Sequence, residues 1–126
     1  MNALTYDTGA LLAAEANHRR IWVLHERAIE RGHRPVVPAG VLGQAWRGGP
    51  QAGLSRLLRG CQVEELTEAR ARAVGLACAR SGMSDIVDAS VVIGALARGD
   101  LVVTSDPDDL RRIAAALRLT LRLHLI

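Results

Sequence analysis

Apolar runs and amphipathic stretches alternate along the chain, and this alternation predicts the fold. Short runs of β-branched and aliphatic residues predict strands, whereas apolar residues that recur every three or four positions predict helices. The expected strands cover residues 3–6, 34–38, 61–66, 101–104 and 119–125. The expected helices cover residues 10–15, 18–31, 40–46, 51–59, 67–80, 85–98 and 111–117. Because strands alternate with helices, we expect an α/β fold with a central, mainly parallel sheet of about five strands flanked by helices.

The same pattern makes finer predictions about burial. Prolines bracket the second strand, so we expect that strand at or near an edge of the sheet. In the last strand, leucines alternate with polar residues from Leu119 to Leu125, which predicts one buried face. The helix over residues 85–98 has almost no polar face and should be buried. Ser84 is its expected cap, and Ser105 or Asp106 is the expected cap of the helix that follows residue 104.

Composition limits the classes of protein that fit. The 126 residues suit one domain over residues 1–126, and 49% hydrophobic residues supply a core that is aliphatic because Phe is absent. All sixteen basic residues are Arg, and the net charge of +3 permits a polyanionic partner without requiring one. Cys61 and Cys78 have no disulfide or metal-ligand spacing. Asp7 interrupts the only apolar stretch near the N-terminus, so we expect a cytoplasmic protein with no signal peptide and no membrane span.

Acidic residues stand where a parallel sheet would form a site. Asp7 follows the first strand and Asp106 follows the fourth, and sites form beyond the carboxyl ends of such strands. Asp88 falls inside an apolar helical run, one turn after Asp85, and a buried carboxylate is costly unless an Arg or a metal compensates it. The structural alternative is that these acids are unrelated caps and ion pairs. If they converge, an all-oxygen cluster suits Mg²⁺ or Mn²⁺, which activate water and stabilise charge on a phosphodiester.

Four segments resemble the PIN domain in their order and spacing, and among PIN domains they look most like the toxin ribonucleases of VapBC toxin–antitoxin pairs. The segments are TYDTGALLAAE, VVPAGVLGQAWRGG, SDIVDASVVIGALA and LVVTSDPDDLRRI. The resemblance implies a PIN-like five-stranded parallel sheet with the first strand central. It also implies endoribonuclease activity that depends on Mg²⁺ or Mn²⁺, an RNA substrate, a cognate antitoxin and a homodimer.

The resemblance also assigns roles to residues of this chain. The acids of the PIN-domain site fall on Asp7, Asp88 and Asp106, which would be the metal ligands. Further residues hold supporting positions, namely Asp109, Asp108, Thr104 and Ser105. The usual Glu of the family is Gln44 here, which removes one negative charge and predicts weaker metal binding, with impaired cleavage as an open alternative. Asp85, Glu15 or Asp109 could supply the missing charge.

Three functions remain open at this stage. The first is a metal-dependent endoribonuclease toxin that hydrolyses RNA phosphodiesters with a metal-activated water. The second is a catalytically impaired PIN-fold binding module that contacts antitoxin or RNA. The third is a phosphoryl-receiver domain, which the absence of Lys disfavours. Arg47, Arg56 and Arg59 could track RNA phosphates, with a solvated face as the alternative for each of them.

Overall fold

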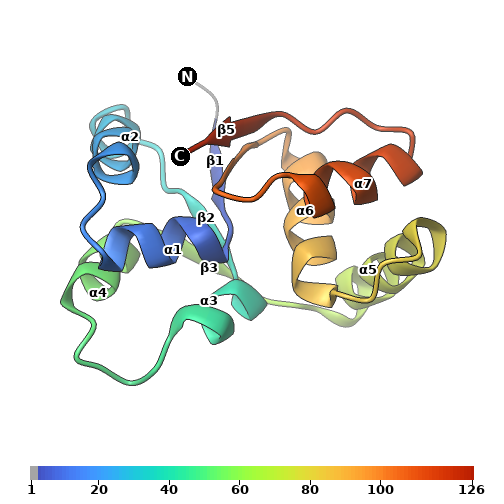
Figure 1. The fold of residues 1–126 in the computed structure, drawn as a ribbon, viewed down its shortest axis with the longest axis horizontal. Coiled ribbons are helices and arrows are strands. Elements are labelled where there is room, and N and C mark those ends of the chain that lie inside the picture. The colour runs from blue at the N-terminus through green and yellow to red at the C-terminus, as the bar shows by residue number, and fades with distance from the viewer. Residues whose placement is uncertain (1–2) are drawn as a thin grey trace.

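The computed structural model describes residues 3–126 and contains one five-stranded sheet (Figure 1). The strands are β1 (Leu4–Tyr6), β2 (Val36–Pro38), β3 (Gln62–Glu64), β4 (Leu101–Thr104) and β5 (Leu123–Leu125). Their order is β3-β2-β1-β4-β5, and every neighbouring pair is parallel. The predicted α/β fold with a parallel sheet and a central first strand is therefore confirmed.

Helices cover both faces of this sheet. They are α1 (Thr8–Glu15), α2 (Arg19–Glu30), α3 (Ala39–Ala45), α4 (Ala52–Arg59), α5 (Glu68–Ser81), α6 (Ile86–Arg98) and α7 (Asp108–Ala116). Figure 1 shows α1, α2 and α4 on one side of the strands and α5, α6 and α7 on the other. Helix α1 contacts β1 and β4, and α6 contacts β1, β2 and β4. This two-sided cover explains why the inner strands are buried almost without interruption.

A small polar cluster fixes α2 against the central strand. The hydroxyl of Tyr6, which is fully buried in β1, lies 2.8 Å from Nδ1 of His25. Trp22 meets the His25 ring edge-on, and the guanidinium of Arg56 lies 3.9 Å from the centre of a Trp22 ring. Burial lowers the pKa of His25, and the charge of Arg56 adds to the effect. The cluster anchors the strand residue immediately before Asp7.

The sheet edges differ from the predictions in one respect. Strand β2 pairs with β1 and β3 and lies next to the edge strand, as expected. The prediction of one buried face for the last strand holds only for Leu121 and Leu123, which are half-buried and pack against the core, whereas Leu119 and Leu125 are 53% and 51% exposed. Strand β5 begins only at Leu123 and lies at the edge of the sheet, where Leu123 is half-buried and His124 and Leu125 are exposed.

The start of α6 also differs from the prediction. The cap is Asp85 and not Ser84, because Oδ1 of Asp85 accepts hydrogen bonds from the N–H groups of Val87 (2.9 Å) and Asp88 (3.1 Å). The buried character of α6 is confirmed over most of its length, although Ile86 in the first turn is 56% exposed.

The start of α7 leaves an acid free. Neither Ser105 nor Asp106 caps this helix; its N-cap is Pro107, which makes no side-chain hydrogen bond. The N–H of Asp106 instead donates to Oγ1 of Thr104 at 3.0 Å. The carboxylate of Asp106 is therefore not used for capping.

Two remaining expectations concern cysteines and membranes. Cys61 is buried, Cys78 is partly buried, and both are free thiols. In the part of the chain that the structure describes, no helix has the length and hydropathy that a bilayer crossing requires.

Candidate active site

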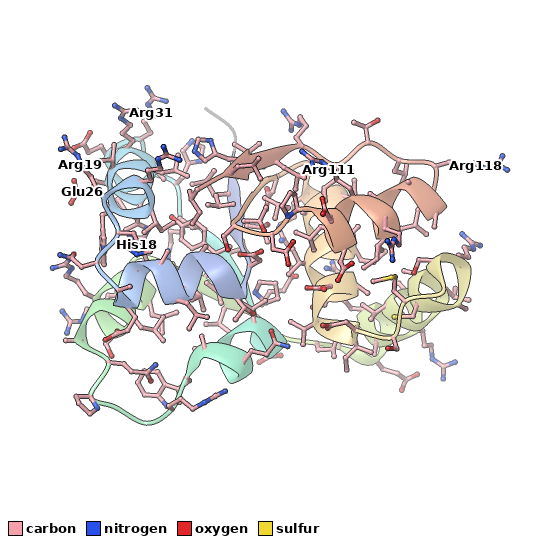
Figure 2. The ribbon with its side chains drawn as sticks, viewed as in Figure 1. His18, Arg19, Glu26, Arg31, Arg111 and Arg118 are labelled. Carbon is pink, nitrogen blue, oxygen red and sulfur yellow. The ribbon has the colours of Figure 1, made fainter. Side chains whose placement is uncertain are left out.

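The topology brings Asp7 and Asp106 to the same edge of the sheet. Strands β1 and β4 are parallel neighbours with Tyr6 opposite Val103, and the N–H of Asp7 donates to the carbonyl oxygen of Val103 at 3.3 Å. Helix α6, whose first turn carries Asp88, packs on both strands. In Figure 2, side-chain oxygens gather in the space between the N-terminal end of α1 and the helices α6 and α7.

Asp7 is both a helix cap and a member of this site. Asp7 is 8% exposed, and its Oδ1 accepts the N–H of Ala10 at 3.0 Å. Burial raises the pKa of Asp7; hydrogen bonds from the Thr104 hydroxyl and from the N–H groups of Ala10 and Gly9 oppose this, and the charge of Asp106 adds to it. The structural role and the proposed chemical role therefore coexist in one side chain.

Asp88 lies in a strongly negative environment. Its pKa is raised to about 6, first by burial and then by the charges of Asp85, Asp109, Asp7 and Asp106. Within residues 3–126, none of these five carboxylates forms a salt bridge. The sequence predicts a buried Asp88 that needs an Arg or a metal; in the structure Asp88 is only partly buried, and within residues 3–126 no Arg forms a salt bridge with it.

The supporting residues divide into two groups. Asp109, in the first turn of α7, raises the pKa of Asp88, whereas its neighbour Asp108 is not among the causes of that shift. Thr104 is fully buried and stabilises the Asp7 carboxylate by hydrogen bonding. Ser105 is exposed and its hydroxyl packs so closely on Gly9 that a Cβ at position 9 would collide with it.

Gln44 lies at the rim of the same site. Its Oε1 accepts a hydrogen bond of 2.5 Å from the hydroxyl of Thr8, which directly follows Asp7. The side chain of Gln44 is exposed and neutral, so it adds a hydrogen-bonding group but no charge. The sequence reasoning missed Thr8, although its position directly after a strand-end acid was a usable signal.

Glu15 cannot replace the missing charge. It lies at the far end of α1 from Asp7, and its Oε2 accepts the N–H of Leu54 at 2.7 Å near the start of α4. Asp85 and Asp109 are the two suggested substitutes that do act on Asp88.

Two of the three arginines expected to contact RNA make contacts within the chain. Nη1 of Arg47 donates to the carbonyl oxygens of Trp46 (2.7 Å) and Gly43 (3.3 Å) at the end of α3. Arg56 stacks on Trp22, as described above, and Arg59 is exposed in the last turn of α4. Arg47 and Arg56 therefore have intramolecular partners.

The oxygen donors at this site suit a hard cation, although they are not arranged as a coordination shell. Carboxylate oxygens with one amide oxygen are the ligands that Mg²⁺ and Mn²⁺ prefer. Across residues 3–126, no group of three or more His, Cys, Asp or Glu side chains is arranged to hold a metal ion. The oxygen donors and the negative charge of the site therefore suit a divalent cation, but the arrangement of the side chains does not form a coordination shell.

The strand order agrees with the α/β domain that the sequence predicts, with a parallel five-stranded sheet and a central first strand. Searches of family models and of curated proteins find no match to this chain. Its fold is similar to the crystal structure of VapBC2 from Rickettsia felis bound to a DNA fragment from their promoter, with a TM-score of 0.74 and 14% identity over 98% of each chain. It is also similar to PAE2754 from Pyrobaculum aerophilum, with a TM-score of 0.62 and 20% identity over 91% of this chain and 86% of that one. These likenesses confirm the resemblance to a VapC-type PIN domain at the level of the fold.

Proposed function

We propose that this protein is a divalent-metal-dependent endoribonuclease and the toxin of a type II toxin–antitoxin pair. The observation that carries the proposal is the uncompensated group of carboxylates around Asp88, at the carboxyl ends of β1 and β4. Unpaired acids cost stability, and clusters that shift one another's pKa values concentrate at functional sites. The VapC-type fold supports the choice of a nuclease over other acid-rich sites.

In this proposal Asp7, Asp88 and Asp106 hold Mg²⁺ or Mn²⁺. When bound, the ion supplies an activated water and stabilises the negative charge that develops on the phosphodiester. The hydroxyl of Thr104 orients the Asp7 carboxylate and accepts the N–H of Asp106, so one buried side chain positions two acids. Asp109 adds negative field that strengthens the attraction for a cation.

The proposed partners rest on the resemblance of the sequence to VapC-type toxins, and the likeness in fold supports that resemblance. The Rickettsia felis structure contains VapBC2 bound to promoter DNA. For the present chain we propose a cognate antitoxin, an RNA substrate, a homodimeric assembly and a cytoplasmic location.

Cleavage of a labelled RNA at increasing Mg²⁺ concentration tests the proposal. Wild-type cleavage should need the added ion and stop with a chelator, and Asp7→Asn or Asp106→Asn should each lower the rate by at least about 100-fold. Asp108→Asn is the matched control, because Asp108 lies on α7 outside the set of acids that act on Asp88. Cleavage that persists in the chelator would contradict the proposal.

A specific observation favours the second candidate, a catalytically impaired binding module: a neutral Gln44 stands at the rim of the site. Gln44→Glu separates the two functions, since a carboxylate can still accept the hydrogen bond from Thr8 while adding one charge. If the nuclease proposal is right, wild type cleaves RNA and the variant needs about tenfold less Mg²⁺ for half-maximal rate. If only the variant cleaves RNA, the natural chain is the binding module.

A further inference from the structure

A basic trough extends from the candidate active site along α2. It consists of two adjoining cavities of about 620 Å³ and about 420 Å³, and Arg19 and Arg20 line both of them. Because Arg19 and Arg20 line both cavities, the two cavities are neighbours along α2, and together they are called the trough.

One end of the trough adjoins the carboxylates. Gly9 and Ser105 line this end, and they lie two residues after Asp7 and one residue before Asp106. The opposite end is lined by Arg27 of α2 and by His124 of β5. The trough therefore connects the candidate active site with the basic side of α2.

The floor of the trough is apolar. Leu12 and Ala13 of α1 contribute to it together with Ile126 at the end of the chain, and Leu12 is 51% exposed. The apolar face of a nucleobase or a sugar can pack on such a surface, while phosphates need charged partners.

The basic wall carries two arginines in register. Arg20 and Arg27 are seven residues apart, two helical turns, so they project from the same side of α2. Arg19 also lines both cavities, and Figure 2 shows it on the same side of α2 as Glu26. Over residues 3–126, neither Arg20 nor Arg27 forms a salt bridge. Arg20 lies in the first turn, where the helix dipole disfavours a cation, so folding gains little from its charge.

We propose that this trough binds single-stranded RNA, with phosphates on Arg20 and Arg27 and with bases or sugars on the apolar floor. The inference rests on the proposed function and deepens it, since it states how the substrate reaches the site. Charge complementarity carries the argument: the acids around Asp88 repel a polyanion, and an adjacent surface with free guanidinium groups offsets that repulsion.

Fluorescence anisotropy with a labelled single-stranded RNA of about ten nucleotides, in a chelator, tests the trough without cleavage. The combined variant Arg20→Ala with Arg27→Ala should bind the RNA about tenfold more weakly than wild type. The slope of log K against log salt should fall by about 1.4, since each lost phosphate contact removes about 0.7. The control is Arg80→Ala with Arg118→Ala, which removes the same charge from exposed positions on α5 and beyond α7; Figure 2 shows Arg118 far from α2.

Two results would overturn the inference. Equal weakening by the two combined variants would mean that RNA senses net charge and not the trough. Unchanged RNA binding in Arg20→Ala with Arg27→Ala would leave the trough to another occupant, such as an acidic segment of a partner protein. Cleavage assays on the same proteins distinguish failure of this inference from failure of the proposed function. If RNA binding depends on the trough but no metal-dependent cleavage occurs, the nuclease proposal is wrong and the trough is still an RNA-binding surface.

Discussion

Two clusters of charged residues in this protein are built in opposite ways. One links Arg98 to Glu64 and Asp100 between α6 and the sheet, and every member has a partner of opposite charge. The other gathers carboxylates around Asp88 at the carboxyl ends of β1 and β4, with no cation among residues 3–126 to pair with them.

The paired cluster is saturated with hydrogen bonds. Asp100 is 4% exposed and accepts from Oγ1 of Thr5 (2.7 Å) and from Nε of Arg98 (2.8 Å). Burial lowers the pKa of Arg98, but its hydrogen bonds to Asp100 and Glu64 outweigh burial, so the pKa is raised overall. Arg70 completes the cluster with a 3.1 Å bond to Glu64. This cluster ties β1, β3, α5 and α6 together.

The comparison of the two clusters distinguishes charges that stabilise the fold from charges that folding alone does not explain. Buried charges that satisfy one another can be explained by folding alone. Charges of one sign that raise one another's pKa values oppose folding, and such sites persist where a ligand is bound. The difference between the clusters therefore supports the proposed metal site, and it can be tested by removing one charge from each.

The largest loss of stability is expected from Arg98→Met. This substitution keeps much of the side-chain volume but leaves Asp100 buried without its cationic partner. The free energy of unfolding should fall by about 3 kcal/mol. Chemical denaturation measures it, with Arg72→Met as the control, because the Arg72–Glu68 pair is solvent-exposed (78% and 82%). The control should change stability by less than about 0.5 kcal/mol. Equal effects of the two variants would remove the distinction between a structural and a surface ion pair.

Asp88→Asn should change the free energy of unfolding by a smaller amount and in the opposite direction. Removing this charge relieves the repulsion from the neighbouring acids, so the metal-free protein should gain about 1 kcal/mol at neutral pH, after allowance for solvent screening. Thermal unfolding in a chelator measures the gain, and Asp108→Asn should show almost none. A loss of stability in Asp88→Asn would mean that the carboxylate makes a favourable contact in the fold.

The pH dependence of this gain provides a sharper test. The pKa of Asp88 is about 6 in the folded protein against 3.8 as its ordinary value, so its contribution to stability is fully present below pH 3.8 and is lost as pH rises through 6. The stability difference between Asp88→Asn and wild type should therefore be small near pH 3.8, grow up to pH 6 and above, and then level off. His25 has a lowered pKa and destabilises both proteins as pH falls below 6.5, so it cancels in the difference. A difference that does not change with pH would contradict the raised pKa.

The sequence by itself determined the order of strands and helices, because hydrophobic periodicity is a local property that each segment carries within itself. It also identified Asp7, Asp88 and Asp106 as unusual, because an acid after a buried strand or inside an apolar helix carries a cost that is visible without coordinates. The exposed face of β5 was not predictable in this way, since alternating leucines do not reveal whether another element will cover them.

Only the tertiary structure decided which charged groups meet. It separated Asp109 from Asp108, assigned Glu15 to the start of α4, and placed Arg20 and Arg27 on the trough while Arg56 stacks on Trp22. The physical reason is that electrostatic and hydrogen-bonding partners depend on how segments far apart in the chain pack together, and the spacing of residues within one helix or strand does not determine that packing.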